Sequence, residues 1–198
     1  MEKPSQILKL IWNNIQDGVK SRHSGFHLMG FHYINHDRPR CTTVVIRNCD
    51  SYARSISFHT DYRQNKSRHI EKNPYVCLLF YSKQEKIQIV CNGKAKLHKN
   101  DIVTETAWKN MQPISKTCYC QDLIPGQPHH AFSNGFSQER WREKSSPQIL
   151  ESGYENFSVI TTTIDQIEWL YLSVEGNKRI QFKYENTDKI WTSNWLIP

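Results

Sequence analysis

The feature that most constrains this chain is a succession of short segments rich in β-branched and aromatic residues, separated by turns. Segments of this kind recur along most of the sequence and are typical of strands. The predicted strands are 26–34, 42–47, 55–58, 75–81, 87–97, 157–163, 167–172, 179–184 and 191–196. Antiparallel strands at this spacing, with few helices between them, favour a closed barrel or a sandwich. We therefore expect a mainly β protein with flanking helices.

An amphipathic helix is predicted before the first strand. Over residues 5–20, isoleucines recur at a four-residue step at Ile7, Ile11 and Ile15, which places them on one helical face. Ser5 is the expected N-cap, because a serine hydroxyl can accept a hydrogen bond from the first turn of a helix.

Two shorter helices are predicted between strands. Residues 62–72 are charged, contain no glycine or proline, and stop at an Asn-Pro pair at 73–74, which ends a helix. Further along, Asn100 or Asp101 can cap a helix that runs through Asn110. The apolar members of this second helix are Ile102, Val103 and Trp108.

Residues 112–153 differ from the rest of the chain, because they hold four of its eight prolines and much of its glycine and serine. A short helix is predicted around residues 137–143, and the remainder is predicted to be loop. Loops of this length usually cover a binding site or a partner surface.

Composition narrows the class of protein. The chain has 198 residues, enough for one sizeable domain, and no apolar run long enough to span a membrane. The N-terminal stretch lacks the apolar region of a signal peptide, so we expect a cytoplasmic protein. The net charge of +7 attracts anions in general. No dense lysine- or arginine-rich run marks a nucleic-acid patch, so nucleic-acid binding is an unfavoured alternative.

The six cysteines show no CxxC spacing. Cys77 and Cys91 lie inside apolar runs and are interpreted as small core residues. Two interpretations apply to Cys118 and Cys120: a zinc site shared with the histidines at 129–130, or ordinary reduced thiols. The reduced thiols are favoured, and no metal is predicted.

Three segments carry residues that suit a flavin mononucleotide. The FMN phosphate requires cations and hydroxyls, which Arg47, Thr60 and Lys66 can supply. The ring requires an apolar slot with a few hydrogen-bonding groups, which Gln88 and the backbone of strand 42–47 can supply. Each residue also has an ordinary structural interpretation. Lys66 and Gln88 can be solvated surface residues, Thr60 can cap a helix, and Arg47 can pair with a carboxylate such as Asp50.

The order and spacing of these segments resemble the pyridoxamine 5′-phosphate oxidase-like family of FMN-binding split barrels, in its less characterised oxidase-related branch. The matching segments are TTVVIR at 42–47, FHTDYRQNK at 58–66, an Asn-Pro pair at 73–74, QIVCNG at 88–93, and Trp191, Leu196 and Pro198 near the C-terminus. The resemblance implies one domain over 1–198, built on a six-stranded antiparallel split β-barrel, with helix 5–20 before it and loop 112–153 inserted.

The resemblance also implies a homodimer with FMN at the subunit interface. The residues it places against the flavin are Thr42, Thr43, Val44, Val45, Arg47, His59, Thr60, Lys66 and Gln88.

Several positions depart from the family pattern. Thr42 stands where the family has an arginine, although Arg40 is two residues away, and Gln64 stands where the family has a serine. In the vitamin B6 enzyme of this family, two residues near the C-terminus hold the substrate and a nearby arginine contacts the flavin. Of the three corresponding positions in this chain, only Arg179 is positively charged. Lys116 and Tyr119 are the nearest candidates for binding a substrate phosphate. We therefore expect little or no pyridoxamine 5′-phosphate oxidase activity.

The leading hypothesis for function is a flavin-dependent oxidoreductase acting on an unknown small substrate, with the redox chemistry in the flavin. His59 is positioned to act as a base, although no catalytic residue is assigned. The alternatives are a module that binds flavin without turnover and a flavin-free interaction module. Uptake of FMN separates the last from the others, and oxidation of a nicotinamide donor separates the first two.

Overall fold

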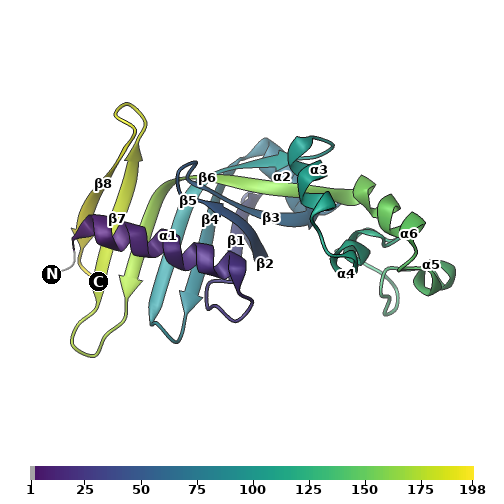
Figure 1. Ribbon diagram of the computed structural model, residues 1–198, viewed down its shortest axis with the longest axis horizontal. Helices are drawn as coiled ribbons and strands as arrows, with labels where there is room; N and C mark the ends of the chain where they lie inside the picture. Colours follow the sequence, from purple (N-terminus) through teal and green to yellow (C-terminus); the bar gives the residue numbers. More distant parts are fainter. Residues whose placement is uncertain (1–2) are drawn as a thin grey trace.

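The computed structural model describes residues 3–198 and contains one antiparallel sheet of eight strands in the order β3-β2-β1-β4-β5-β6-β7-β8 (Figure 1). The strand bounds are β1 Leu28–Asn35, β2 Arg38–Asp50, β3 Ser55–Asp61, β4 Tyr75–Ser82, β5 Ile87–His98, β6 Phe157–Tyr171, β7 Lys178–Glu185 and β8 Ile190–Leu196. Strand β3 also pairs with β6, which closes β1–β6 into a six-stranded barrel. This confirms the expected split barrel. Strands β7 and β8 extend the sheet beyond it.

Strand β6 shows how the barrel splits. Its first half pairs with β3, and on the same edge its second half pairs with β7. The sequence predicted two strands here, 157–163 and 167–172, but the structure has one continuous strand, so that prediction was wrong. The reason is a β-bulge, because Asn92 pairs with Gln166 while Gly93 pairs with Ile164, and the intervening Asp165 is an extra residue. The bulge shifts the alternation of buried side chains without ending the strand.

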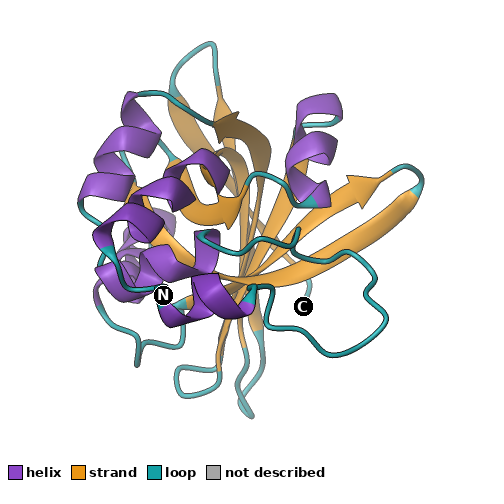
Figure 2. Ribbon diagram, turned by 90° about the vertical axis from the view of Figure 1, so that its right-hand side faces the viewer, coloured by secondary structure: helices purple, strands orange, loops and turns teal. Residues whose placement is uncertain are grey.

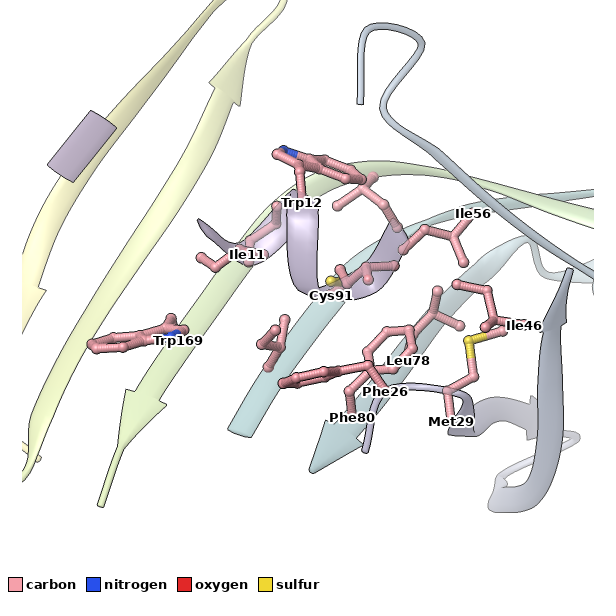
Figure 3. Close-up of a cluster of buried hydrophobic side chains, with 14 of the residues drawn as sticks. Ile11, Trp12, Phe26, Met29, Ile46, Ile56, Leu78, Phe80, Cys91 and Trp169 are labelled. Atoms are coloured by element: carbon pink, nitrogen blue, oxygen red, sulfur yellow. The ribbon is translucent and has the colours of Figure 1, made fainter. Parts of the chain in front are cut away.

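The buried core consists mainly of aromatic and branched side chains from the strands and from the N-terminal helix, and Figure 3 shows part of it. Phe31 on β1 and Phe58 on β3 are fully buried, and their ring centroids lie 4.8 Å apart. Cys91 belongs to this core and is buried, as predicted, whereas Cys77 is only partly buried. The contact between Phe31 and Phe58 packs β3, the strand that closes the barrel, against the buried core.

Helix α1 (Pro4–Lys20) lies across one face of the sheet (Figure 1). Its buried face includes the predicted isoleucines and Trp12, whose ring meets Trp191 of β8 edge-on at 6.5 Å. The N-cap is Lys3, with Pro4 in the first turn, so the prediction of Ser5 was wrong. At Gly18, an added Cβ would lie 2.3 Å from the Phe26 carbonyl oxygen, so only glycine allows this close approach.

The two inserted helices are α2 (Asn65–Lys72) and α3 (Ile102–Lys109). Asp101 is the N-cap of α3, and its carboxylate accepts a hydrogen bond from the Thr104 backbone at 3.0 Å. Helix α2 begins three residues later than predicted, because residues 62–64 form a turn. Of the apolar members named for this helix, Trp108 is buried, whereas Ile102 is 74% exposed.

The segment 112–153 contains more helix than predicted (Figure 2). Besides the predicted short helix, α5 (Gln138–Arg142), which Ser137 caps, it contains α4 (Pro113–Lys116), η1 (Thr117–Tyr119) and α6 (Pro147–Ser152), followed by η2 (Gly153–Asn156). The segment packs on the barrel through a second cluster of buried side chains, made of Trp108, Tyr119, Phe157 and Val159. No helix within residues 3–198 is long and apolar enough to cross a bilayer.

Candidate functional site

A groove lies outside the barrel between β2, β3, the start of α2 and the segment after α4. We call it the β2–β3 groove, and its volume is about 370 Å³. It brings together eight of the predicted site residues: Thr43, Val44, Val45, Arg47, His59, Thr60, Lys66 and Tyr119. A smaller hollow of about 240 Å³ adjoins it at Gln64, Lys66 and Pro125, and Thr42 lines that hollow.

Lys66 is the most unusual side chain in the groove, because it is a cation with only 8% of its surface exposed. Its ammonium donates a hydrogen bond to the Gln64 side chain. It forms no ion pair with any residue in the described range 3–198, because the nearby Asp61 carboxylate is held by Arg63 at 2.8 Å. Burial lowers the pKa of Lys66, and Asp61 opposes that shift. A buried cation without a direct counter-ion is stabilised by an anion that enters the groove.

Arg47 owes its position to a β-bulge in β2. Ile46 pairs with Phe58 and Asn48 pairs with Ser57, so Arg47 is the extra residue and is left out of the ladder. A bulge shifts the alternation of side chains along a strand, and here the extra residue, Arg47, lines the groove. Arg47 makes no hydrogen bond or ion pair within residues 3–198. Asp50, the alternative partner, instead accepts from the backbones of Tyr52 and Ala53.

His59 lies on β3 at one end of the groove, and its ring meets Phe157 edge-on at a centroid distance of 5.0 Å. Burial, assisted by the positive charge of Arg47, lowers the pKa of His59 from 6.5 to about 4. The imidazole is therefore neutral near pH 7, with one nitrogen able to accept and the other able to donate a hydrogen bond.

This lowered pKa predicts a stability change with pH in the flavin-free protein. Between about 4 and 6.5 the unfolded chain binds a proton at His59 that the native protein does not, so the free energy of unfolding falls as the pH falls through this window. We expect a loss of about 1–2 kcal/mol between neutral pH and about pH 5 from this group. Urea unfolding of wild type and His59→Gln at both pH values measures it, and equal pH dependence in the two proteins would contradict it.

Three predicted site residues lie away from the groove within one chain. Gln88 lies on β5 and points away from the buried core. In the sheet it is paired with Leu170 of β6, and Leu170 is paired on its other side with Arg179 of β7. Arg179 binds the Glu168 carboxylate through two nitrogens, at 2.9 and 2.7 Å. Lys116 donates to Glu151 at 3.3 Å and lies over the Trp108 ring, so its charge faces the 112–153 segment.

The groove fits the demands of a flavin mononucleotide. The buried ammonium of Lys66, the Arg47 guanidinium and the Thr60 hydroxyl are the groups that a phosphate requires. The Val45 side chain gives an apolar wall for a flat ring, whereas the Val44 side chain packs against the buried core, because neighbouring side chains of a strand lie on opposite faces. Thr42 lines the adjoining hollow at the position where the family pattern has an arginine. The Lys66 end of the groove therefore has one positively charged residue fewer than that pattern.

Sequence analysis missed several residues that shape the site. The Asp61–Arg63 pair was not recognised, although these residues stand within the quoted motif. The bulge at Arg47 gives no signal in a single sequence, because both sides of it read as strand. The analysis also missed a cavity of about 720 Å³ between β3 and α3, which shares Arg47 and His59 with the groove. Residues 3–198 contain no cluster of three or more metal-ligating side chains.

The closed six-stranded barrel, with a cationic groove on its outside, has the split-barrel fold. Residues 6–99 match the family model described as pyridoxamine 5′-phosphate oxidase, FMN-binding domain.

A curated relative, the pyridoxine/pyridoxamine 5′-phosphate oxidase of Rubrobacter xylanophilus, is 41% identical over 58 residues. That match covers 29% of this chain and about a quarter (26%) of the relative.

Two solved structures share the fold over the whole of this chain. A pyridoxamine 5′-phosphate oxidase-related FMN-binding protein from Nostoc punctiforme has a TM-score of 0.77, 18% identity and 100% coverage of both chains. PhzG from Burkholderia lata, solved with tetrahydrophenazine-1-carboxylic acid, has a TM-score of 0.70 and 16% identity, and the match covers 94% of that chain.

Proposed function

We propose that this protein binds FMN in the β2–β3 groove and is a flavin-dependent oxidoreductase for a small substrate, without appreciable pyridoxamine 5′-phosphate oxidase activity. The observation that carries the proposal is the convergence of the buried Lys66 and the unpaired Arg47 on one groove with an apolar wall. The family-model match over residues 6–99 and the FMN-binding relative from Nostoc support the same assignment.

Each group in the groove has a distinct role in this proposal. Lys66 and Thr60 bind the phosphate, Val45 packs against the ring, and Arg47 lies at the end shared with the larger cavity. A bound flavin supplies the redox chemistry by accepting and returning a hydride. The neutral imidazole of His59 can accept a proton where the two cavities meet.

We propose further that the working form is a homodimer. The outward face of the sheet carries Leu28 and Tyr81, whose side chains are 52% and 49% exposed, beside the half-buried Leu79 and Val90. Apolar groups gathered on one sheet face are typical of a protein interface. Gln88 lies on this same face. In a homodimer formed through this face, Gln88 of one protomer would therefore reach the groove of its partner.

The test combines binding and turnover. Purified protein is titrated with FMN, and the loaded protein is then supplied with NADH or NADPH and, separately, with pyridoxamine 5′-phosphate. The proposal expects FMN uptake, oxidation of a nicotinamide donor, and negligible formation of pyridoxal 5′-phosphate. Uptake without any turnover favours a flavin-binding module, and no uptake favours a flavin-free interaction module.

Restoring the missing cation should strengthen FMN binding. Thr42 and Lys66 line the same hollow, so Thr42→Arg places a guanidinium near the expected phosphate position. We expect FMN affinity to rise about tenfold, because a charge-assisted bond to phosphate is added. Flavin fluorescence quenching measures the affinity, and Thr42→Gln is the control for side-chain length without charge. Equal affinity in the two variants would count against a phosphate at this end.

A further inference from the structure

The smaller hollow beside the β2–β3 groove, here called the Thr42 hollow, has a volume of about 240 Å³. At about 30 Å³ for each water molecule, this volume corresponds to roughly eight waters, which leaves room beyond a phosphate held by Lys66 and Thr60. An arginine at position 42 would reach into this room, whereas a threonine side chain is too short to fill it. The Thr42 hollow can therefore accept a further group attached to that phosphate.

The polar lining of the Thr42 hollow suits an anion. Lys66 contributes its ammonium, and no carboxylate lines the hollow. The hydroxyls of Tyr33 and Thr42 line it too, and neither makes a side-chain hydrogen bond within residues 3–198. Burial raises the pKa of Tyr33, so its phenol stays protonated and can donate a hydrogen bond. An anion in the hollow would therefore meet one cation and two free hydroxyl donors.

Arg40 brings a second cation next to the Thr42 hollow. It lies two residues before Thr42 on β2, so the two side chains leave the strand on the same face, about 7 Å apart. Across the β1–β2 ladder Arg40 is paired with Tyr33, and its positive charge opposes the rise that burial causes in the pKa of Tyr33. Arg40 is exposed and makes no hydrogen bond or ion pair within residues 3–198. Its guanidinium is therefore free to bind an anion beside Tyr33.

A row of aromatic rings leads from the Thr42 hollow to the surface. Tyr33 lines the hollow, and the ring of His69 on α2 stacks against it with the centroids 6.1 Å apart. His36, in the turn between β1 and β2, meets His69 edge-on at 5.5 Å. Tyr33 and His69 are half-buried, whereas His36 is exposed. Rings of this kind are the surfaces on which nucleobases stack in proteins.

We propose that the Thr42 hollow binds the second phosphate of flavin adenine dinucleotide, that Arg40 pairs with this phosphate, and that the adenine stacks on the aromatic row. This inference rests on the proposed flavin function and makes FAD, instead of FMN, the preferred form of the cofactor. The first phosphate stays with Lys66 and Thr60. Each phosphate of the linked pair carries one negative charge, which one cation, Lys66 or Arg40, can match. The terminal phosphate of FMN carries nearly two negative charges beside Lys66 alone.

Calorimetric titration of the flavin-free protein with FAD, FMN and ADP tests the ligand class without relying on turnover. We expect FAD to bind at least tenfold more tightly than FMN, and at least tenfold more tightly than ADP, which carries the adenosine and the phosphates without the flavin. FMN binding that equals or exceeds FAD binding overturns this inference and leaves the proposed flavin function standing. ADP binding as tight as FAD binding overturns it too, because the site would then recognise a free nucleotide. Binding of neither flavin overturns the proposed function and this inference with it.

Two variants locate the second phosphate. We expect Arg40→Gln to lower FAD affinity about tenfold and to change FMN affinity less than twofold. Arg68→Gln is the matched control, since Arg68 is an exposed arginine on α2 that lines neither hollow, and it should change neither affinity. Thr42→Arg should reverse the preference, because its guanidinium fills the Thr42 hollow and pairs with the first phosphate. Unchanged FAD affinity in Arg40→Gln, an equal loss for both flavins there, or tighter FAD binding by Thr42→Arg overturns the proposal.

Discussion

Replacing Lys66 by methionine is expected to weaken FMN binding about 100-fold, because the variant loses the buried cation that faces the groove. An ion pair formed where solvent is largely excluded is strong, and losing one partner leaves the phosphate charge uncompensated. Flavin fluorescence quenching gives the dissociation constants of both proteins.

The flavin-free Lys66→Met variant should be at least as stable as wild type. The substitution replaces a buried charge without an ion pair by an apolar side chain of similar length. Lys72→Met is the matched control, since Lys72 is an exposed lysine on the same helix and should leave FMN affinity unchanged. A stable Lys66→Met protein that binds FMN as tightly as wild type would contradict the proposed phosphate contact.

Replacing Phe58 by alanine is expected to lower the free energy of unfolding by about 3–5 kcal/mol, a large share of the stability of a typical domain. Phe58 is fully buried on β3, the strand whose pairing with β6 closes the barrel, and its ring packs on Phe31 at 4.8 Å. Truncation removes the buried ring and leaves a cavity between the closing strand and the core.

The measurement is urea unfolding at a fixed protein concentration, because a dimer makes apparent stability concentration-dependent. Phe132→Ala is the control, since that side chain is 98% exposed and its loss should change stability by less than about 0.5 kcal/mol. A similar midpoint for Phe58→Ala and Phe132→Ala would mean that the closing strand contributes little to the folded state.

The barrel could be predicted because its strands carry a strong local pattern. The segments around Phe58 and Leu78 are apolar and β-branched over several residues, and the structure has strands there. Where a bulge changes the alternation of buried and exposed residues, the sequence pattern gave a wrong prediction. At Asp165 the buried positions change phase, and the sequence was read as two strands instead of one.

The site was predicted less completely, for reasons that lie in tertiary structure. Lys66 was named from its motif, but its burial depends on how α2 packs against the barrel, which no local pattern encodes. Ile102, Val103 and Trp108 were named as the apolar members of one helix, but only Trp108 of the three is buried, which depends on how the helix packs and not on its local sequence. Gln88 lies away from the groove within one chain, and it would reach a groove only in the proposed homodimer, which a single sequence does not specify.

The most direct test of the central claim is a titration of purified protein with FMN, followed by visible absorption and flavin fluorescence. The account predicts saturable uptake of one FMN per chain and a bound spectrum of oxidised flavin. Addition of FMN to Lys66→Met should show much weaker uptake under the same conditions. A wild-type protein that remains colourless and leaves the fluorescence of added FMN unchanged would contradict the assignment.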